Sequence, residues 1–169
     1  MPACNISQVG ADANAIKGWN GQSALMIAIH FGNAEVAKLL IANGATVSYA
    51  PPACNLTALH QCVRLAVAGS PVDALDIVKI LFQYGANANQ ADRIGETALH
   101  KLLIDAWSLR HDDVCIQNII PIALCLVQNG ARMPTTTKER YLAGNPLWDT
   151  VETAMLQEKS GRCSLKLRA

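Results

Sequence analysis

The chain has 169 residues, of which 51% are hydrophobic but only 5% are aromatic. A chain of this length can bury roughly two thirds of its unfolded surface in one domain, and the scarcity of aromatic residues means that Ala, Leu, Ile and Val must fill the interior. The formal net charge of +1 provides no long-range attraction for nucleic acid or for an anionic membrane, so neither partner is expected.

The sequence shows no membrane-spanning segment and no secretory signal. The longest apolar run, from Ile119 to Val127, contains Pro121 and is far shorter than the ~20 residues that cross a bilayer. The first residues lack the basic start and apolar stretch of a signal peptide. We therefore expect a protein of the cytoplasm, or of the cytosol of a host cell, with the nucleus left open. The six cysteines are then expected to be reduced and mostly buried.

Two short motifs recur along the chain. The front motif Gly-Glu-Thr-Ala-Leu-His at 95–100 has related copies at 21–25 and 55–60 and an eroded copy at 145–148. The tail motif Gly-Ala-Asn-Ala-Asn at 85–89 recurs at 10–14 and 44–48, and weakly at 130–133. Two interleaved motifs that repeat every few dozen residues indicate a solenoid.

The first full repeat extends over about residues 18–48. Ser23 stands where a helix needs an N-cap oxygen, Gly32 separates two short helical patterns, and Gly44 follows the second pattern. A glycine in this place supplies the left-handed residue that ends a helix. Residues 1–9 precede the first tail motif, and they are either a half repeat that caps the stack or the cut edge of a longer chain.

The second repeat, at about 52–89, is longer than the first. Its front and tail motifs are separated by seven more residues than those of the first repeat, which corresponds to about two helical turns. Shared between two helices, this insertion lengthens each by about one turn. Ser70 and Pro71 suit the cap and the first residue of a helix, so we predict helices at about 58–68 and 71–84.

The third repeat, at about 92–133, is longer still. It predicts a helix from Thr97 to about Leu109, a polar turn at 110–113, and a long helical segment up to Gln128. Pro121 either kinks this segment or marks a fresh start. A partial repeat at 140–158, with a helix from about 146 to 157, closes the stack, and the basic tail at 159–169 is expected to be disordered.

The combined pattern resembles the ankyrin repeat, whose front motif is Gly-x-Thr-Pro-Leu-His and whose tail is Gly-Ala-x-x-Asn. The resemblance covers almost the whole chain and implies an ankyrin repeat domain at 1–158. The implied fold is an all-α solenoid with β-hairpin-like connectors, and the insertions predict elongated helices in the second and third repeats. One departure is Asn55, which replaces the front glycine.

The resemblance also implies where a partner protein binds, namely the hairpin tips and the concave helix surface. Carried over repeat by repeat, the tip positions are Trp19, Asn20, Ala53, Cys54, Arg93, Ile94, Tyr141 and Leu142, and the positions after the front residue are Gln22 and Glu96. The concave helix positions are His30, Phe31, Arg64, Leu65, Ile104 and Asp105. As an alternative to partner binding, some of the large apolar residues Trp19, Phe31, Ile94 and Tyr141 pack back onto the longer helices. Separately, the longer helices are a second candidate site, because they form a ridge.

The residue types that often carry catalysis have structural explanations here. His60 and His100 occupy a motif position that, in the ankyrin family, ties neighbouring turns together by hydrogen bonds. His111 and Cys115 have the spacing of half a zinc site, but no second pair completes it. No phosphate-binding loop, nucleophile elbow or recognisable carboxylate pair is present. We therefore expect no enzyme activity, no cofactor and no metal.

The sequence leaves three hypotheses about function, of which the third is a metal or thiol sensor that would use His111 and Cys115. The preferred one is a monomeric, stand-alone adaptor or inhibitor that binds a protein partner, with a pathogen effector as one form of such a protein. The alternative is a recruitment segment cut from a larger enzyme or channel.

Overall fold

The computed structural model describes residues 12–16, 21–68, 70–108, 113–132, 147–153 and 156. Six labelled helices follow one another along these residues: α1 (Ala24–His30), α2 (Ala34–Ala42), α3 (Ala58–Val67), α4 (Pro71–Gln83), α5 (Ala98–Ser108) and α6 (Asp113–Gln128). Residues 147–153 are also helical. Within the described ranges the only β-type pairing is one isolated antiparallel bridge between Ile16 and Ser23, so the expected β-hairpin-like connectors remain a prediction.

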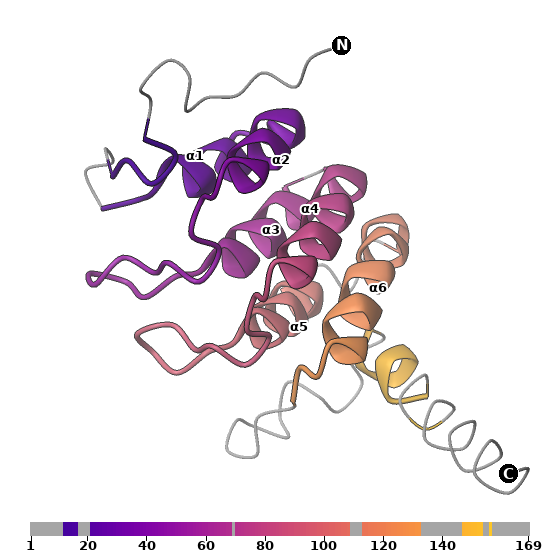
Figure 1. The fold of residues 1–169 in the computed structure, drawn as a ribbon. Coiled ribbons are helices and arrows are strands. Elements are labelled where there is room, and N and C mark those ends of the chain that lie inside the picture. The colour runs from indigo at the N-terminus through magenta and orange to yellow at the C-terminus, as the bar shows by residue number, and fades with distance from the viewer. Residues whose placement is uncertain are drawn as a thin grey trace, which may run out of the picture.

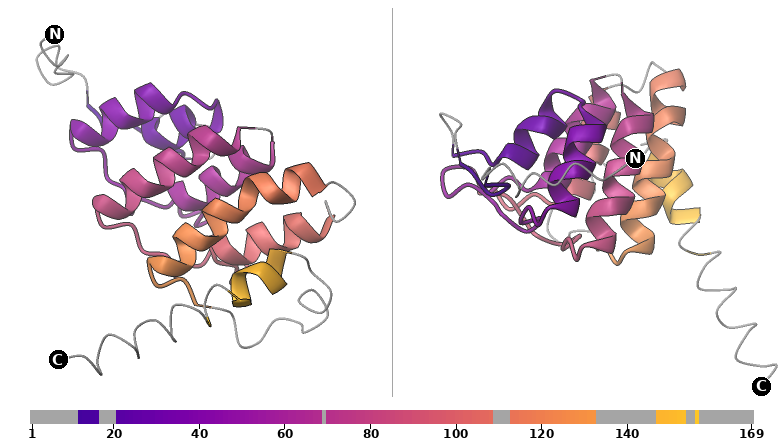
Figure 2. Two further views of the ribbon diagram at one scale, coloured as in Figure 1. Left: turned by 90° about the vertical axis from the view of Figure 1, so that its right-hand side faces the viewer. Right: turned by 45° about the horizontal axis from the view of Figure 1, so that its top comes forward.

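The helices form two rows, as Figures 1 and 2 show. One row consists of α1, α3 and α5, in which α1 packs on α3 and α3 on α5. The other consists of α2, α4 and α6, packed in the same order, and each helix also packs on its partner in the other row. The loops that join successive pairs extend to one side, beside the row of α1, α3 and α5 (Figure 1). The chain is therefore an all-α solenoid, as the motifs predict. We call the row of α1, α3 and α5 the inner row and the row of α2, α4 and α6 the outer row.

The insertions predicted from motif spacing lie within the helices. From the first repeat to the second, the inner helix grows from 7 to 10 residues and the outer helix from 9 to 13. In the third repeat they reach 11 and 16 residues. The predicted helices at 58–68 and 71–84 are confirmed to within one residue, and lengthening both members of a pair keeps their apolar faces in register.

Polar residues start the inner helices where the sequence predicts. The Ser23 hydroxyl accepts a hydrogen bond from the Met26 backbone N–H at 3.3 Å, and the Thr97 hydroxyl accepts one from the His100 N–H at 3.3 Å. These bonds satisfy backbone donors that the first turn of a helix leaves free. Ser70 also occupies an N-cap position, but its side chain makes no capping bond, and Pro71 is the first helical residue.

The long helix α6 continues through Pro121 without a break in its helical assignment. A proline has no N–H to donate to the carbonyl four residues before it, which here belongs to Gln117. Both Pro121 and Gln117 are exposed. The carbonyl that loses this donor therefore belongs to an exposed residue, and the fresh start that the sequence left open does not occur.

Small and branched aliphatic residues fill the interior, as the composition requires. Ala37, Ala74 and Ala123 are fully buried where helices meet, which lets the two rows pack closely. Cys62 is also fully buried, and burial raises the pKa of its thiol far above the ordinary value. This cysteine is a core residue, as expected. Within the described ranges, no helix is both long and apolar enough to span a bilayer.

Candidate functional site

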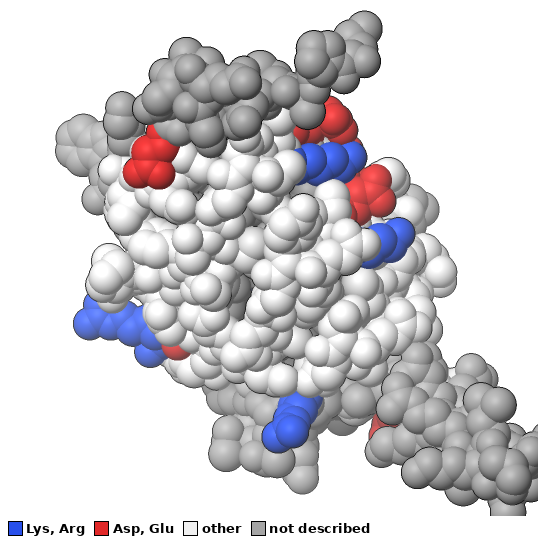
Figure 3. Space-filling view, in the orientation of Figure 1, with Lys and Arg blue, Asp and Glu red and all other residues white. Residues whose placement is uncertain are grey.

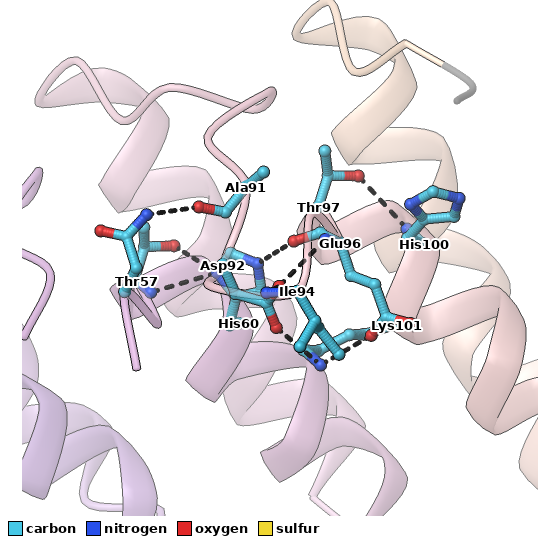
Figure 4. Close-up of polar contacts among 10 residues, drawn as sticks. Thr57, His60, Ala91, Asp92, Ile94, Glu96, Thr97, His100 and Lys101 are labelled. Atoms are coloured by element: carbon cyan, nitrogen blue, oxygen red, sulfur yellow. Dashed lines mark hydrogen bonds and ion pairs between the residues drawn. The ribbon is translucent and has the colours of Figure 1, made fainter. Parts of the chain in front are cut away.

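Asp92 organises the loop between α4 and α5. Its backbone N–H donates to the Glu96 carbonyl at 2.8 Å, and its Oδ1 accepts from the N–H groups of Ile94 at 3.0 Å and Glu96 at 2.9 Å. An aspartate that accepts from backbone groups two and four residues ahead fixes a tight turn. This turn positions the residues that lead into α5, as Figure 4 shows.

Lys101, on the first turns of α5, lies between two carboxylates (Figure 4). Its Nζ is 2.9 Å from Oδ2 of Asp92 and 2.9 Å from Oε2 of Glu96. Burial by itself would raise the pKa of Asp92, but the hydrogen bonds from Glu96 and Lys101 outweigh it and hold this pKa below the ordinary value. Burial would lower the pKa of Lys101, yet the two carboxylates raise it. The three side chains therefore form one charged cluster that anchors the loop to α5.

His60 connects the second repeat to the third. Its Nδ1 accepts a hydrogen bond from the Thr57 N–H at 3.1 Å, and its Nε2 lies 3.0 Å from the Glu96 carbonyl oxygen. Because Nδ1 accepts, Nε2 carries the proton and donates to Glu96. Burial lowers the pKa of the ring, which favours this neutral form. His60 thus links neighbouring turns, as the resemblance implies.

A pocket of about 390 Å³ opens between α3, α5 and the loop before α5. Its lining comprises Leu56, Arg64, Glu96, Lys101, Ile104 and Asp105. Four of these were predicted as contact residues from the sequence: Arg64, Glu96, Ile104 and Asp105. The structure therefore brings together positions that are up to 41 residues apart in the chain, from the second and third repeats.

Asp105 and Arg64 give this pocket an unusual charge distribution. Asp105 is partly buried and Arg64 is exposed, and the ion pairs between described residues include neither of them. Burial raises the pKa of Asp105, with Glu96 adding to the effect and Lys101 and Arg64 opposing it. Because neither group is held in an ion pair between described residues, both can bind charged groups of a ligand.

A smaller pocket of about 90 Å³ adjoins the larger one. It is lined by His30, Gln61, Arg64, Leu65 and Ala68, so Arg64 borders both pockets. Gln61 is fully buried, and neither atom of its carboxamide has a hydrogen-bond partner. Sequence reasoning did not select Gln61. The available signal was a polar residue at a position occupied by Ile27 in the first repeat and by Lys101 in the third.

Of the other described positions that were predicted as contact residues, His30 and Leu65 line the smaller pocket, and we call the two adjoining pockets the groove. Leu65 is only 8% exposed and packs close to Gly32, so it offers little surface. Phe31 is 78% exposed and lines a separate apolar pocket of about 450 Å³ on the α1–α2 pair. Gln22 is partly buried.

The loop tip before α5 has an exposed apolar side chain and is hydrogen-bonded to the loop before α3. Ile94 is 74% exposed. Arg93 Nη1 donates to the Ala53 carbonyl at 3.2 Å, and its backbone N–H donates to the Cys54 carbonyl at 3.1 Å. These bonds join the loop before α5 to the loop before α3, so the backbone next to Ile94 is held in place.

Several predicted residues lie outside the described part of the chain: Trp19, Asn20, Tyr141, Leu142 and His111, and also the side chain of Cys115. Within the described part, no three His, Cys, Asp or Glu side chains are grouped so that they could hold a metal ion.

The family of the chain is shown by its match to a model for ankyrin repeats in three copies, over residues 3–92. This is more than half of the chain, and the helix pairs and connecting loops agree with it. The chain belongs to the ankyrin repeat family.

Individual relatives support the same assignment. The putative ankyrin repeat protein FPV031 of Fowlpox virus (strain NVSL) is 38% identical over 80 residues, which are 47% of this chain and 21% of the relative. Ankyrin repeat and SOCS box protein 6 of Homo sapiens is 31% identical over 117 residues, or 69% of this chain and 25% of the relative. The same protein of Pongo abelii is 30% identical over 117 residues, again 69% of this chain and 25% of the relative. The chain thus spans between a fifth and a quarter of the length of these relatives.

Proposed function

We propose that this protein binds a protein partner in the groove along its inner row of helices, without catalysis of its own. Ankyrin repeats are protein–protein interaction modules, and the chain belongs to that family. The observation that carries the proposal is the pocket in which Arg64, Glu96, Ile104 and Asp105 meet. These four positions, which the resemblance to ankyrin repeats implies as contact residues, line one pocket.

The rigidity of the groove supports the proposal. Asp92, Glu96 and Lys101 fix one wall through charge-assisted hydrogen bonds, and His60 joins this wall to α3. A preformed surface lowers the ordering cost of association. Ile94 provides an exposed apolar contact at the tip, and a few such anchors carry much of the binding energy in protein interfaces.

Charge is arranged differently on the outer helices. Lys38 pairs with Glu35 at 3.0 Å on α2, and Lys79 lies 3.9 Å from Asp76 on α4. Figure 3 shows a face with few charged side chains, most of them near its edges. Lys38 and Lys79 of the outer helices thus lie close to carboxylates of their own helices, whereas Arg64 and Asp105 of the inner row line a pocket.

The proposal is tested by affinity purification followed by mass spectrometry with matched variants. The inner-row variant replaces Arg64 and Ile104 with Ala, and the outer-row variant replaces Val72 and Lys79 of α4 with Ala. Arg64, Val72 and Lys79 are exposed and Ile104 is only partly buried, so both variants should retain the helical signal in circular dichroism. We expect the inner-row variant to lose the proteins captured by the wild type and the outer-row variant to keep them. The opposite pattern would contradict the assigned surface.

The finer role that we infer is that of an adaptor or inhibitor in the cytoplasm, acting by masking its partner. The viral relative is consistent with a pathogen effector. A second function is favoured by the small share of each relative that the chain spans, namely a recruitment segment within a larger protein. The length of the natural reading frame distinguishes these two.

A further inference from the structure

Gln61 and Lys101 occupy the same position in successive repeats, four residues after Thr57 and Thr97. Lys101 is neutralised by Asp92 and Glu96. At the corresponding positions of the second repeat, the chain has Pro52 and Leu56, whose side chains can neither donate nor accept. The carboxamide of Gln61 therefore has no counterpart of the cluster that satisfies Lys101.

A buried carboxamide without hydrogen-bond partners destabilises the folded protein. Gln61 is fully exposed to water in the unfolded chain, whereas in the fold its Nε2 and Oε1 are buried and have no hydrogen-bond partner. Burial of unpaired polar groups opposes folding. An apolar residue stands at the same place in the first repeat, Ile27, so the position does not require a polar side chain for the fold. A functional explanation for the glutamine is therefore needed.

The charges of the adjoining pocket indicate the other part of the ligand. Asp92, Glu96 and Lys101 together carry one net negative charge, and Asp105 adds a second, while Arg64 supplies one positive charge near both pockets. One added positive charge would balance the groove. A basic side chain placed beside Asp105 and Glu96 would gain two carboxylate partners in a partly buried setting.

We propose that the groove holds an extended segment of the protein partner, with a Lys or Arg side chain beside Asp105 and Glu96 and with the backbone N–H and C=O of one residue hydrogen-bonded to Gln61. The inference rests on the proposed function and adds the chemistry of the partner. In an extended segment the backbone N–H and C=O of one residue point to the same side, so together they can pair with the oxygen and the nitrogen of the carboxamide. Arg64 borders both pockets and can donate hydrogen bonds to a carboxylate of the same segment.

The carboxamide of Gln61 is closed to solvent in the structure. The side chain has several rotatable bonds, and the smaller pocket of about 90 Å³ lies beside it. A rotation toward that pocket brings the amide to the bound segment. Binding thus relieves the cost that Gln61 imposes on the free protein, and the position contributes to affinity at the expense of stability.

The experiment selects binding peptides from a displayed library of random linear sequences, using the whole chain as bait. We expect the selected peptides to be enriched in Lys and Arg. One selected peptide is then measured by calorimetry against Asp105→Asn, which should weaken binding roughly tenfold or more because a charge-assisted contact is lost. The control is Asp76→Asn, the same change on the exposed face of α4, which should leave the affinity unchanged.

Gln61→Leu supplies an independent readout. It removes the buried unpaired amide, so we expect the melting temperature to rise by roughly 2–4 °C while the affinity for the selected peptide falls. A lower melting temperature with unchanged affinity would show that Gln61 is a structural residue and would overturn its assigned role.

The remaining outcomes separate this inference from the proposed function. If the library gives no binders, or binders without basic residues, the basic segment is wrong. The wider proposal of a protein partner is then still judged by the inner-row and outer-row variants. If basic peptides bind equally well to wild type and Asp105→Asn, the carboxylate that we assign to them is wrong.

Discussion

At the scale of single residues, Asn55 shows how the second repeat retains its loop without the expected glycine. Its φ of 54° is left-handed, like the φ of 69° at Gly21 and of 85° at Gly95, which hold the same position. Asparagine adopts this conformation more readily than most residues because its short polar side chain can bond locally. Here Nδ2 donates to the Ala91 carbonyl at 2.6 Å, so the substitution adds a link between repeats.

Asn55→Ala is therefore expected to destabilise the protein by roughly 1–2 kcal/mol, because alanine lacks the bond and resists the left-handed region. Urea unfolding monitored by circular dichroism measures the change. Asn55→Gly separates the two effects, since glycine accepts the conformation and loses only the bond. If alanine and glycine destabilise equally, backbone strain plays no part.

His60 makes stability depend on pH. Burial lowers the pKa of the folded ring below the ordinary value of 6.5, so above that value both the folded and the unfolded states are neutral. As the pH falls below 6.5, the unfolded state gains a proton that the folded state resists, and the free energy of unfolding decreases. Unfolding curves between pH 8 and pH 5 should show this decrease, and His60→Gln should make it shallower. An identical slope in the variant would assign the effect to other groups.

At the scale of elements, the tail motifs form hydrogen-bonded links between successive repeats. Asn14 Nδ2 donates to the Gly44 carbonyl at 3.1 Å, and Asn14 Oδ1 accepts from the Thr46 N–H at 2.7 Å. Asn89 makes the same two bonds to Gly130 and Arg132, at 2.8 and 2.7 Å. The intermediate tail has Ser48 at this position, whose side chain is shorter, so the middle link is missing.

Ser48→Asn should complete the series by bonding to the Gly85 carbonyl and the Asn87 N–H. We expect a gain of about 1 kcal/mol in the free energy of unfolding, the usual net value of such hydrogen bonds. Ser48→Ala should have little effect, because Ser48 is exposed. A destabilised Ser48→Asn protein would mean that the second and third tails are spaced differently from the others.

Most of the helical architecture could be predicted from the sequence because it depends on local signals. The starts at Ser23, Thr57 and Thr97 are set by caps, and motif spacing predicted the elongation of α3 and α4. The sequence did not decide whether α6 continues through Pro121 or starts afresh there, since a continuous helix depends on which side of the helix carries the carbonyl that loses its donor. That side is fixed only by packing against the neighbouring repeat.

At the scale of the whole molecule, the groove lies between repeats, so its lining comes from distant parts of the chain. The repeat register selected Arg64, Glu96, Ile104 and Asp105, because equivalent positions face the same side of a solenoid. It did not select Gln61, whose amide has no partner in a repeat where Pro52 and Leu56 stand in place of Asp92 and Glu96. It also could not show that Leu65 is buried while Phe31, at the same position one repeat earlier, is exposed. That difference arises because α1 and Gly32 lie against Leu65, whereas no described repeat covers Phe31.

Site-specific photo-crosslinking in cells tests most directly whether the inner row is the binding surface. A photoreactive amino acid is placed at Ile104 in the groove or at Val72 on the outer helix α4, and covalent adducts are identified by mass spectrometry. We predict that Ile104 captures a specific protein and that Val72 captures none. Adducts at Val72 together with none at Ile104 would contradict the account.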